Sequence, residues 1–405
     1  MRPVLGVLGM PGSGKSQIAD FLRTCGLPVV RLGGFVEEEI ERRGLPPTSA
    51  SETIVRNSLR EEFGKDVLAK RVLEMIANDD STTPFVLDGV ASPEEDLAIR
   101  SSLGKDYFTI AVLVDRLLRY TRLETRGGRH LTNEQAEERD LQEIHSLRKA
   151  ECIVLADYFV LNNRDLKTLL NSTLAKVVEK LLLTVGGLDH LWIQLDSEKL
   201  ITKIEQAGTL TNNDIWLILA KAQLLDSPIL NWHACKIIGD HRYIGGEEFL
   251  MRIGARQDIE FDQSSLHRIA AYALSRIRIR TEKILPLLRS NSSQTRKFAV
   301  DVLGELGDEE AFDAIEHLLV AETDEEVILW AGLALAKIAK KSLLPELEER
   351  LSALVEQLNN FKRYIAFDAL QRVNHGRAEL LVVKMHATGE ISDAEDEHLR
   401  SRLRA

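Results

Sequence analysis

The chain has 405 residues, 44% of them hydrophobic, and carries 52 Lys and Arg against 63 Asp and Glu, a net charge of −11. This length favours two or more domains, and the acidic balance argues against broad non-specific binding of DNA. Because no uninterrupted apolar run of about 18 residues occurs, no membrane span is expected. The amino terminus has no signal-peptide pattern, and the three cysteines lack metal-ligand spacing, as is typical of reduced thiols in a cytoplasmic protein.

The first predicted elements are a buried strand over Val4–Leu8, a loop with the sequence GMPGSGKS, and a helix near 16–24. The loop matches the pattern G-x-x-x-x-G-K-[ST], in which backbone N–H groups converge on the phosphates of a nucleotide. We expect Lys15 against the outer phosphates and the Ser16 hydroxyl on Mg²⁺, so the expected cofactors are ATP or another nucleoside triphosphate, and Mg²⁺. A chance match in a glycine-rich turn is the alternative. The residues predicted to bind the nucleotide in this segment are Gly9, Pro11, Gly12, Ser13, Gly14, Lys15, Ser16 and Gln17.

A second strand, Pro28–Leu32, is followed by helices near 35–43 and 52–78 and by a third strand in the segment FVLDGV. Asp88 follows the apolar residues Phe85–Leu87, so it is expected at the carboxyl end of that strand. A carboxylate there can bind Mg²⁺ opposite the serine of the phosphate loop. An Asp-Gly turn without a metal is the alternative.

Four arginines follow a helix near 93–103 and a strand over Phe108–Val114, in the segment RYTRLETRGGRH. Three of them are spaced three and four residues apart, on one face of a helix predicted near 115–125. A Gly-Gly pair then ends the helix and places the last arginine on a loop. Phosphoryl transfer needs positive charge around the transferred group and a lid that excludes water, so a lid is predicted at about 119–140. A solvated helix face with ordinary ion pairs is the alternative. The four arginines are Arg119, Arg122, Arg126 and Arg129.

Helices near 134–154 and 164–183, with a strand over Tyr158–Leu161 between them, complete the first part of the chain. Regular alternation of strands and helices predicts an α/β fold with a parallel sheet covered by helices on both faces. Ligands of such sheets bind beyond the carboxyl ends of the strands, which is where the phosphate loop is expected.

The order of these motifs resembles the nucleoside-monophosphate-kinase-like P-loop proteins, most closely an archaeal nucleotide-kinase-like family related to adenylate and dephospho-CoA kinases. The resembling stretches are GVLGMPGSGKS, LREEFGKDVLAKR, LDGV, RLETRGGR, ERD and LADYFVLNN, within about residues 1–170. The resemblance implies a five-stranded P-loop kinase fold, MgATP or a similar donor, a small phosphorylated acceptor and a closing lid. The roles it implies are catalysis for the lid residues Arg122, Arg126 and Arg129, acceptor binding for Arg60 and Arg71, and a place near the donor base for Asn162 and Asn163.

This sequence departs from that family at three positions expected near the acceptor. Gly34 and Glu37 stand where the family commonly has an aspartate and an arginine, and Ala91 stands where it often has another arginine. A phosphate beside Glu37 is repelled unless a cation compensates the carboxylate. Otherwise the acceptor is not an ordinary nucleoside monophosphate, or water is the only acceptor. The candidate cations are Arg31, Arg56, Arg60 and Arg71.

Arg60 and Arg71 are eleven residues apart, close to three turns of a continuous helix. We therefore expect them on one face, where two guanidinium groups can clamp the acceptor's phosphate. In the alternative interpretation they only pair with the nearby carboxylates Glu61, Glu62 or Glu74.

The second part of the chain, after a composition change near Gly186-Gly187, has a helical pattern throughout. The template A-x-x-x-L-x-x-[ILV] recurs at 263–405, which predicts an all-α, HEAT-like solenoid; an irregular helical bundle is the alternative. The expected domains are a P-loop domain at 1–185, a helical region of degraded periodicity at 186–262, and the solenoid. The four matches are Ala270/Leu274/Ile277, Ala299/Leu303/Leu306, Ala331/Leu335/Ile338 and Ala366/Leu370/Val373.

A solenoid surface normally binds another macromolecule or a second copy of its own chain. A basic cluster in this region lacks the interleaved aromatic residues of a base-stacking platform, so nucleic acid is not favoured. A solvated ridge neutralised by neighbouring acids is the preferred interpretation. The cluster consists of Arg276, Arg278, Arg280, Lys283, Arg289, Arg296 and Lys297.

Two functions are consistent with these patterns. The first is an ATP-dependent phosphotransferase that acts on a nucleotide or similar small phosphorylated acceptor and uses its helical repeats for assembly or partner binding. The second is a regulatory P-loop NTPase whose nucleotide state is signalled to a partner through the solenoid. The lid arginines favour the first function, and the departures at Gly34, Glu37 and Ala91 favour the second.

Overall fold

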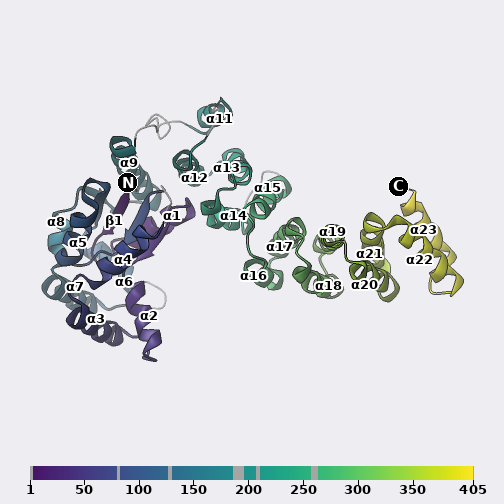
Figure 1. Ribbon diagram of the computed structural model, residues 1–405, viewed down its shortest axis with the longest axis horizontal. Helices are drawn as coiled ribbons and strands as arrows, with labels where there is room; N and C mark the ends of the chain where they lie inside the picture. The colour runs from purple at the N-terminus through teal and green to yellow at the C-terminus, as the bar shows by residue number, and fades with distance from the viewer. Residues whose placement is uncertain are drawn as a thin grey trace. The chain divides into compact units, whose positions relative to one another are not determined.

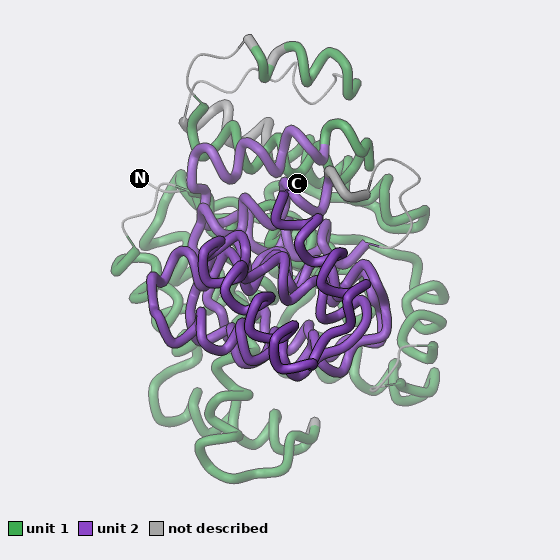
Figure 2. The backbone as a smooth tube through the Cα atoms, turned by 90° about the vertical axis from the view of Figure 1, so that its right-hand side faces the viewer, with its two compact units in different colours: residues 1–230 green, residues 231–405 purple. Residues whose placement is uncertain are grey.

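The computed structural model describes residues 3–79, 83–125, 130–185, 196–206, 210–256 and 263–404. The chain forms two compact units, residues 1–230 and 231–405 (Figure 2). The composition boundary expected near Gly186-Gly187 lies outside the described residues. None of the described helices has the length and hydropathy needed to cross a bilayer.

A five-stranded parallel sheet in the order β2-β3-β1-β4-β5 forms the centre of the first unit. All five residues of the central strand β1 are buried, and Val7 of this strand lies opposite Asp88 in the register of β3. The predicted α/β fold with a parallel sheet is therefore confirmed. The strands are β1 (Val4–Leu8), β2 (Val29–Arg31), β3 (Phe85–Asp88), β4 (Tyr107–Leu113) and β5 (Tyr158–Leu161).

Helices cover both faces of this sheet (Figure 1). Side chains of alternate strand residues, such as Val4 and Leu8, pack with α4, α5 and α8 in one buried cluster, while α1 contacts β3 on the other face and also packs against α9. The helices up to residue 185 are α1 (Lys15–Thr24), α2 (Gly34–Arg42), α3 (Ser49–Phe63), α4 (Val67–Ala77), α5 (Pro93–Leu103), α6 (Arg116–Glu124), α7 (Asn133–Leu147), α8 (Lys149–Val154) and α9 (Leu166–Val185).

Two helices predicted to be continuous are interrupted. The one expected near 52–78 ends at Phe63, because Gly64 has φ +96° and ψ +158°, which no α-helix accommodates. The one expected near 134–154 turns at Arg148, whose φ of +56° is left-handed. Neither break was predicted, because the apolar pattern runs through both.

The first unit continues beyond α9 with α11 (Ser197–Gln206) and α12 (Asn212–Leu225). The nine buried residues of α12 lie around most of its circumference, and the helix packs against α1 and α9. Gln223 of α12 accepts a hydrogen bond of 2.7 Å from the hydroxyl of Thr24 at the end of α1. Residues 196–230 are thus part of the compact unit that contains the phosphate loop.

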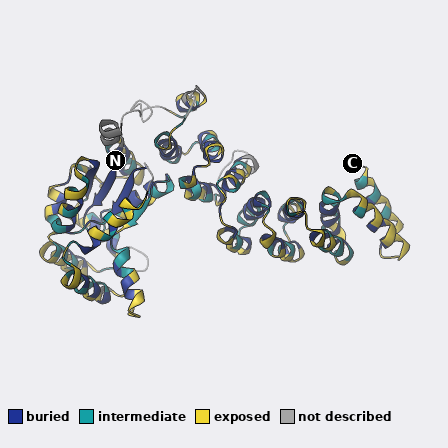
Figure 3. Cartoon of the chain, in the orientation of Figure 1, coloured by how far each residue is buried: buried dark blue, intermediate teal, exposed yellow. Residues whose placement is uncertain are grey.

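The second unit is all-helical in its described residues, and α15, α17, α19 and α21 pack one on the next. The repeated Ala and Leu of the template are buried in these four helices, and Figure 3 shows buried residues along the helices of this unit. At one contact the helices are very close: a Cβ added to Gly304 would lie 3.0 Å from the Cα of Ala334. The helices are α13 (Pro228–His241), which spans the unit boundary, α14 (Glu247–Gly254), α15 (Gln263–Arg276), α16 (Thr281–Ile284), α17 (Ser293–Leu306), α18 (Phe312–Ala321), α19 (Glu325–Ser342), α20 (Pro345–Gln357), α21 (Asn360–Val373), α22 (His375–Ala387) and α23 (Asp393–Leu403).

Part of the predicted basic cluster is neutralised by acidic neighbours, in line with a solvated ridge. Three of its seven members form ion pairs within the described residues: Arg296 with Glu322, Lys297 with Glu326, and Lys283 with Glu247.

Candidate nucleotide site

The segment between β1 and α1 forms a tight loop whose backbone shape depends on glycine. Gly12 and Gly14 have φ of +77° and +94°, in the region that other residues rarely adopt. A Cβ on Gly12 would lie 2.8 Å from the carbonyl oxygen of Arg119, and a Cβ on Gly14 would lie 2.4 Å from Nδ2 of Asn162. The loop therefore has the positive-φ turns that direct backbone N–H groups toward one anion.

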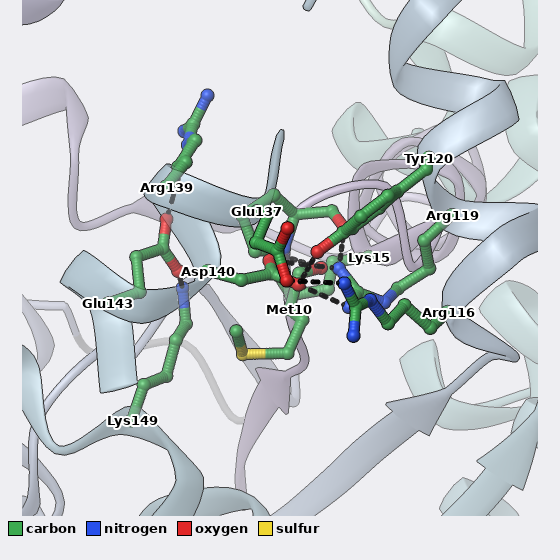
Figure 4. Close-up of polar contacts among 11 residues, drawn as sticks. Met10, Lys15, Arg116, Arg119, Tyr120, Glu137, Arg139, Asp140, Glu143 and Lys149 are labelled. Atoms are coloured by element: carbon green, nitrogen blue, oxygen red, sulfur yellow. Dashed lines mark hydrogen bonds and ion pairs between the residues drawn. The ribbon is translucent and has the colours of Figure 1, made fainter. Parts of the chain in front are cut away.

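Two side chains from later in the chain hold the outer side of this loop. Asn162, just after β5, donates from Nδ2 to the carbonyl of Ser13 at 2.8 Å. Arg119 of α6 donates from Nη1 to the carbonyl of Pro11 at 2.9 Å, and its guanidinium is bound at both ends by Asp140 of α7, at 3.0 and 2.5 Å (Figure 4). These contacts occupy the carbonyls of Pro11 and Ser13, and within the loop the N–H of Ser13 donates to the carbonyl of Met10 at 3.1 Å.

Lys15, the first residue of α1, lies at the inner side of the loop. Its ammonium donates to the carbonyl of Met10 at 3.1 Å (Figure 4). Burial of the ammonium, and next the nearby Lys149, lower the pKa of Lys15 to about 7, against the opposing pull of Glu143 and Asp88. The residue as a whole is only partly buried, so the shift reflects the position of the ammonium. A group so desolvated gains most from an anionic ligand.

Ser16 and Asp88 lie at the carboxyl edge of the sheet, on α1 and at the end of β3. Ser16 is exposed, whereas Asp88 is buried, and burial raises the pKa of Asp88 against the pull of Lys15 and Arg31. Mg²⁺ is usually held by one or two carboxylates or hydroxyls together with nucleotide phosphates and water. A buried carboxylate across from a P-loop serine fits that mode of binding. No group of three or more His, Cys, Asp or Glu able to hold a metal by themselves occurs in the part of the chain described.

Two buried polar atoms beside the loop support binding of a polar ligand. Ser13 Oγ and Arg122 Nη1 have no hydrogen-bond partner among the described residues. The other terminal nitrogen of Arg122 donates to the carbonyl of Asn162 at 2.9 Å. Because an unpaired buried donor is costly, this guanidinium is poised for a ligand.

The structure does not bring all predicted residues to the loop. Asn162 is buried and bound to the loop, which favours holding the loop over contacting a base, and Asn163 accepts a hydrogen bond from the N–H of Asp115 at 3.0 Å. Gln17 is exposed in the first turn of α1. Arg126 and Arg129 lie outside the described residues.

The arginines predicted to clamp an acceptor phosphate are engaged separately. Because the helix breaks at Gly64, Arg60 is on α3 and Arg71 on α4, so the prediction of one continuous face was wrong. Arg60 donates at 2.9 Å to Glu95, which is only 1% exposed. Arg71 lies over the Phe35 ring, with its guanidinium carbon 6.0 Å from the ring centroid.

Neither arginine pairs with the carboxylates that the alternative interpretation named; within the described residues, no ion pair involves Glu61, Glu62 or Glu74. Of the four cations proposed to compensate Glu37, Arg31 forms an ion pair with it.

Three charged residues near Lys15 were not predicted as site residues. Arg139 and Glu143 belong to α7, and Lys149 opens α8, where it donates to Glu143 at 2.5 Å (Figure 4). The resembling stretch ERD contains Arg139, but only the turn at Arg148 brings Lys149 back toward α7.

Known proteins resemble the two parts of this chain separately. A family model described as an AAA domain matches residues 5–144, and one described as HEAT repeats matches residues 281–360. The crystal structure of shikimate kinase from Bacteroides thetaiotaomicron covers 44% of this chain and 98% of its own, at 15% identity and a TM-score of 0.31. The two family models confirm the predicted fusion of an amino-terminal P-loop part with HEAT-like repeats.

Relatives of the first part come from archaea. The UPF0200 protein of Hyperthermus butylicus is 39% identical over 168 residues, 41% of this chain and 88% of that protein. The UPF0200 protein of Aeropyrum pernix is 37% identical over 171 residues, 42% of this chain and 88% of that protein. Through its amino-terminal P-loop part, the chain belongs to the UPF0200 family.

Proposed function

We propose that this protein is an ATP-dependent phosphotransferase that transfers the terminal phosphoryl group of MgATP to a nucleotide or similar small acceptor. The observation that carries the proposal is the desolvated Lys15 ammonium, whose pKa of about 7 reflects burial at the inner side of a loop shaped to bind phosphate. A P-loop lysine in that position stabilises charge that develops on the outer phosphates during transfer.

The residues around the loop have separate tasks in this proposal. The loop N–H groups bind the donor phosphates, Arg122 places its free nitrogen beside them, and Ser16 and Asp88 are the residues that would hold Mg²⁺. Mg²⁺ supplies neutralisation of phosphate charge when bound. Arg119 and Asp140 link the loop to α6 and α7, so closure of the proposed lid at about 119–140 acts on the loop directly. Exclusion of water then favours transfer over hydrolysis.

The acceptor is expected on the side of α2, α3 and α4, where three helices occupy the connection between the adjacent strands β2 and β3. Among the predicted acceptor residues, Arg71 has no carboxylate partner within the described residues and lies against an aromatic ring. We therefore propose Arg71, rather than Arg60, as the main acceptor-binding cation.

A regulatory NTPase is the second candidate, and one observation favours it. Arg60 pairs with Glu95 and Arg31 pairs with Glu37, so much of the positive charge expected for an acceptor phosphate is already neutralised. In this case water accepts the phosphoryl group, and the HEAT-like repeats, which we propose as a surface for a protein partner or a second copy, respond to the nucleotide state. The three cysteines are buried free thiols, consistent with the cytoplasm as the proposed location.

The deciding experiment incubates the full chain with MgATP and single compounds from a panel of nucleosides, nucleoside mono- and diphosphates and coenzyme precursors. ADP is followed by a coupled assay, and products are identified by mass spectrometry. The phosphotransferase is supported when one compound stimulates ADP formation and gains a phosphoryl group. Equal ADP and inorganic phosphate with every compound supports the NTPase. No ADP formation in any reaction would contradict both.

A further inference from the structure

A buried ion pair lies at the corner between α7 and α8. Arg148 adopts a left-handed conformation that turns the chain, so Lys149 points back to a residue six positions earlier. Its ammonium donates to Oε2 of Glu143 at 2.5 Å, and Oε1 of Glu143 accepts from Nε of Arg139 at 3.4 Å. The side chains of Lys149 and Glu143 are only 9% and 14% exposed.

The ion pair between Lys149 and Glu143 is expected to add little to the stability of the fold. The desolvation of two charges usually offsets most of their attraction, so apolar residues of similar size would serve the fold as well or better. Both side chains lie close enough to the Lys15 ammonium to interact with it electrostatically, and Figure 4 draws them in the same close-up as Lys15. The pair therefore lies within electrostatic reach of the position expected for the outer phosphates.

The charged side chains that act on Lys15 belong to β3, α7 and α8. The cations are Lys15 itself, Lys149 and Arg139, and the anions are Asp88 of β3 and Glu143. Glu143 is shared by two cations, so positive charge exceeds negative charge before any ligand binds. This excess matches the added negative charge of an outermost phosphate.

We propose that Lys149 binds the outermost phosphate of a nucleoside triphosphate, and that Glu143 holds the Lys149 ammonium in place until the nucleotide arrives. The inference rests on the proposed nucleotide site and adds a residue that distinguishes a triphosphate from a diphosphate. Because Lys149 opens a helix that follows α7 directly, binding also ties α7, and with it Asp140 and Arg119, to the presence of the last phosphate.

The test measures ATP and ADP affinities of the full chain by calorimetry, with Mg²⁺ and before significant turnover. The variants are Lys149→Met, Lys149→Arg and Glu143→Gln. Lys70→Met is the matched control, because Lys70 pairs with Asp66 at 3.0 Å on the surface of α4. We expect Lys149→Met to weaken ATP binding at least tenfold and ADP binding less than twofold. Lys149→Arg should recover part of the preference for ATP over ADP, and Lys70→Met should bind both nucleotides with wild-type affinity.

Glu143→Gln separates the proposal from a merely structural ion pair. If Glu143 only holds Lys149 in reserve, its neutral variant frees the ammonium and increases the preference for ATP over ADP. If the pair only supports packing, Lys149→Met and Glu143→Gln lower the melting temperature and change both affinities alike, and this result overturns the proposal. Should Lys149→Met fail to fold, the ratio of ATP affinity to ADP affinity in Glu143→Gln decides: a ratio above that of the wild type supports the proposal, and an equal or lower ratio refutes it. A wild-type chain that binds neither nucleotide refutes the proposed function itself, whereas normal wild-type binding with an unchanged ratio in Lys149→Met refutes only this inference.

Discussion

Thr24 and Gln223, separated by 199 residues, are joined by a hydrogen bond of 2.7 Å from the threonine hydroxyl to the glutamine side-chain oxygen. The other end of the Gln223 amide donates to the Sγ of Cys25 at 3.1 Å. Thr24 is the last residue of α1, the helix that follows the phosphate loop. Gln223 thus connects α12 to α1, the helix whose first residue, Lys15, belongs to the nucleotide site.

This connection predicts that a fragment of residues 1–185 is less stable than a fragment of residues 1–230. Both contain every proposed site residue, so both should bind ATP, but the shorter one exposes the surface of α1 and α9 that α12 covers. We expect a lower melting temperature for 1–185, measured by circular dichroism. Equal melting temperatures would mean that α12 adds nothing and that the first domain ends at 185, as proposed from the sequence.

Replacement of Lys15 by alanine is expected to abolish ATP turnover while the chain stays folded. Among the described residues the Lys15 ammonium makes one hydrogen bond, to a backbone carbonyl, and its desolvation disfavours its charged form in the absence of ligand. Loss of the group should therefore cost little stability and remove the charge that faces the outer phosphates. Turnover is measured by ADP release, and folding by circular dichroism; wild-type rates in the folded variant would disprove the assignment of the loop.

ATP binding is expected to take up a proton near neutral pH. Lys15 has a pKa of about 7 in the free protein, and a bound polyphosphate raises it, so a lysine that is half neutral becomes fully charged. As far as Lys15 determines it, the affinity for ATP should be constant below pH 7 and fall as the pH rises above 7. Calorimetry in buffers of different ionisation enthalpy measures the proton count directly, and Lys15→Met should abolish the uptake. Proton release or none in the wild type would contradict the prediction.

The lowered pKa of Lys15 also determines how the free energy of unfolding changes with pH in the absence of nucleotide. Between about pH 7 and the ordinary lysine pKa of 10.5, the unfolded chain binds more protons at Lys15 than the folded chain does. The contribution of this residue to the free energy of unfolding therefore becomes more favourable as pH rises through that range. Urea unfolding of the wild type and of Lys15→Met, each at pH 7 and at pH 9, measures this contribution as the difference between their changes in free energy of unfolding.

Arg60 and Arg71 are expected to behave differently when changed to alanine. Within the described residues, Arg60→Ala leaves the carboxylate of the buried Glu95 with only the backbone N–H of Ala91 as a partner. The change should destabilise the fold by about 3 kcal/mol, at the lower end for a broken buried pair. Arg71→Ala should change stability by less than about 0.5 kcal/mol but raise the acceptor's KM. Urea unfolding and steady-state kinetics measure the two effects. An unaltered KM in Arg71→Ala on every accepted substrate would favour the NTPase.

The parts of the site that are contiguous in sequence could be predicted, and those that depend on distant packing could not. The loop from Gly9 to Ser16 carries its function in adjacent residues, whereas Asn162 reaches the Ser13 carbonyl across 149 residues. The pairing of Arg60 with Glu95 was hidden for the same reason. The break at Gly64 was missed for a different reason: a glycine inside an apolar helical pattern is tolerated and does not by itself end a helix, whereas the backbone angles of Gly64 do.

The close approach of α17 and α19 at Gly304 has a consequence for the whole second unit. A methyl group there would meet Ala334 at 3.0 Å, and one on Gly332 of α19 would lie 2.3 Å from the Ile365 side chain in α21. Since each repeat contacts only its neighbours, a wedge inserted at either glycine is not absorbed by a surrounding core. It displaces the neighbouring repeat instead, so the spacing of α17, α19 and α21 depends on two residues that have no side chain.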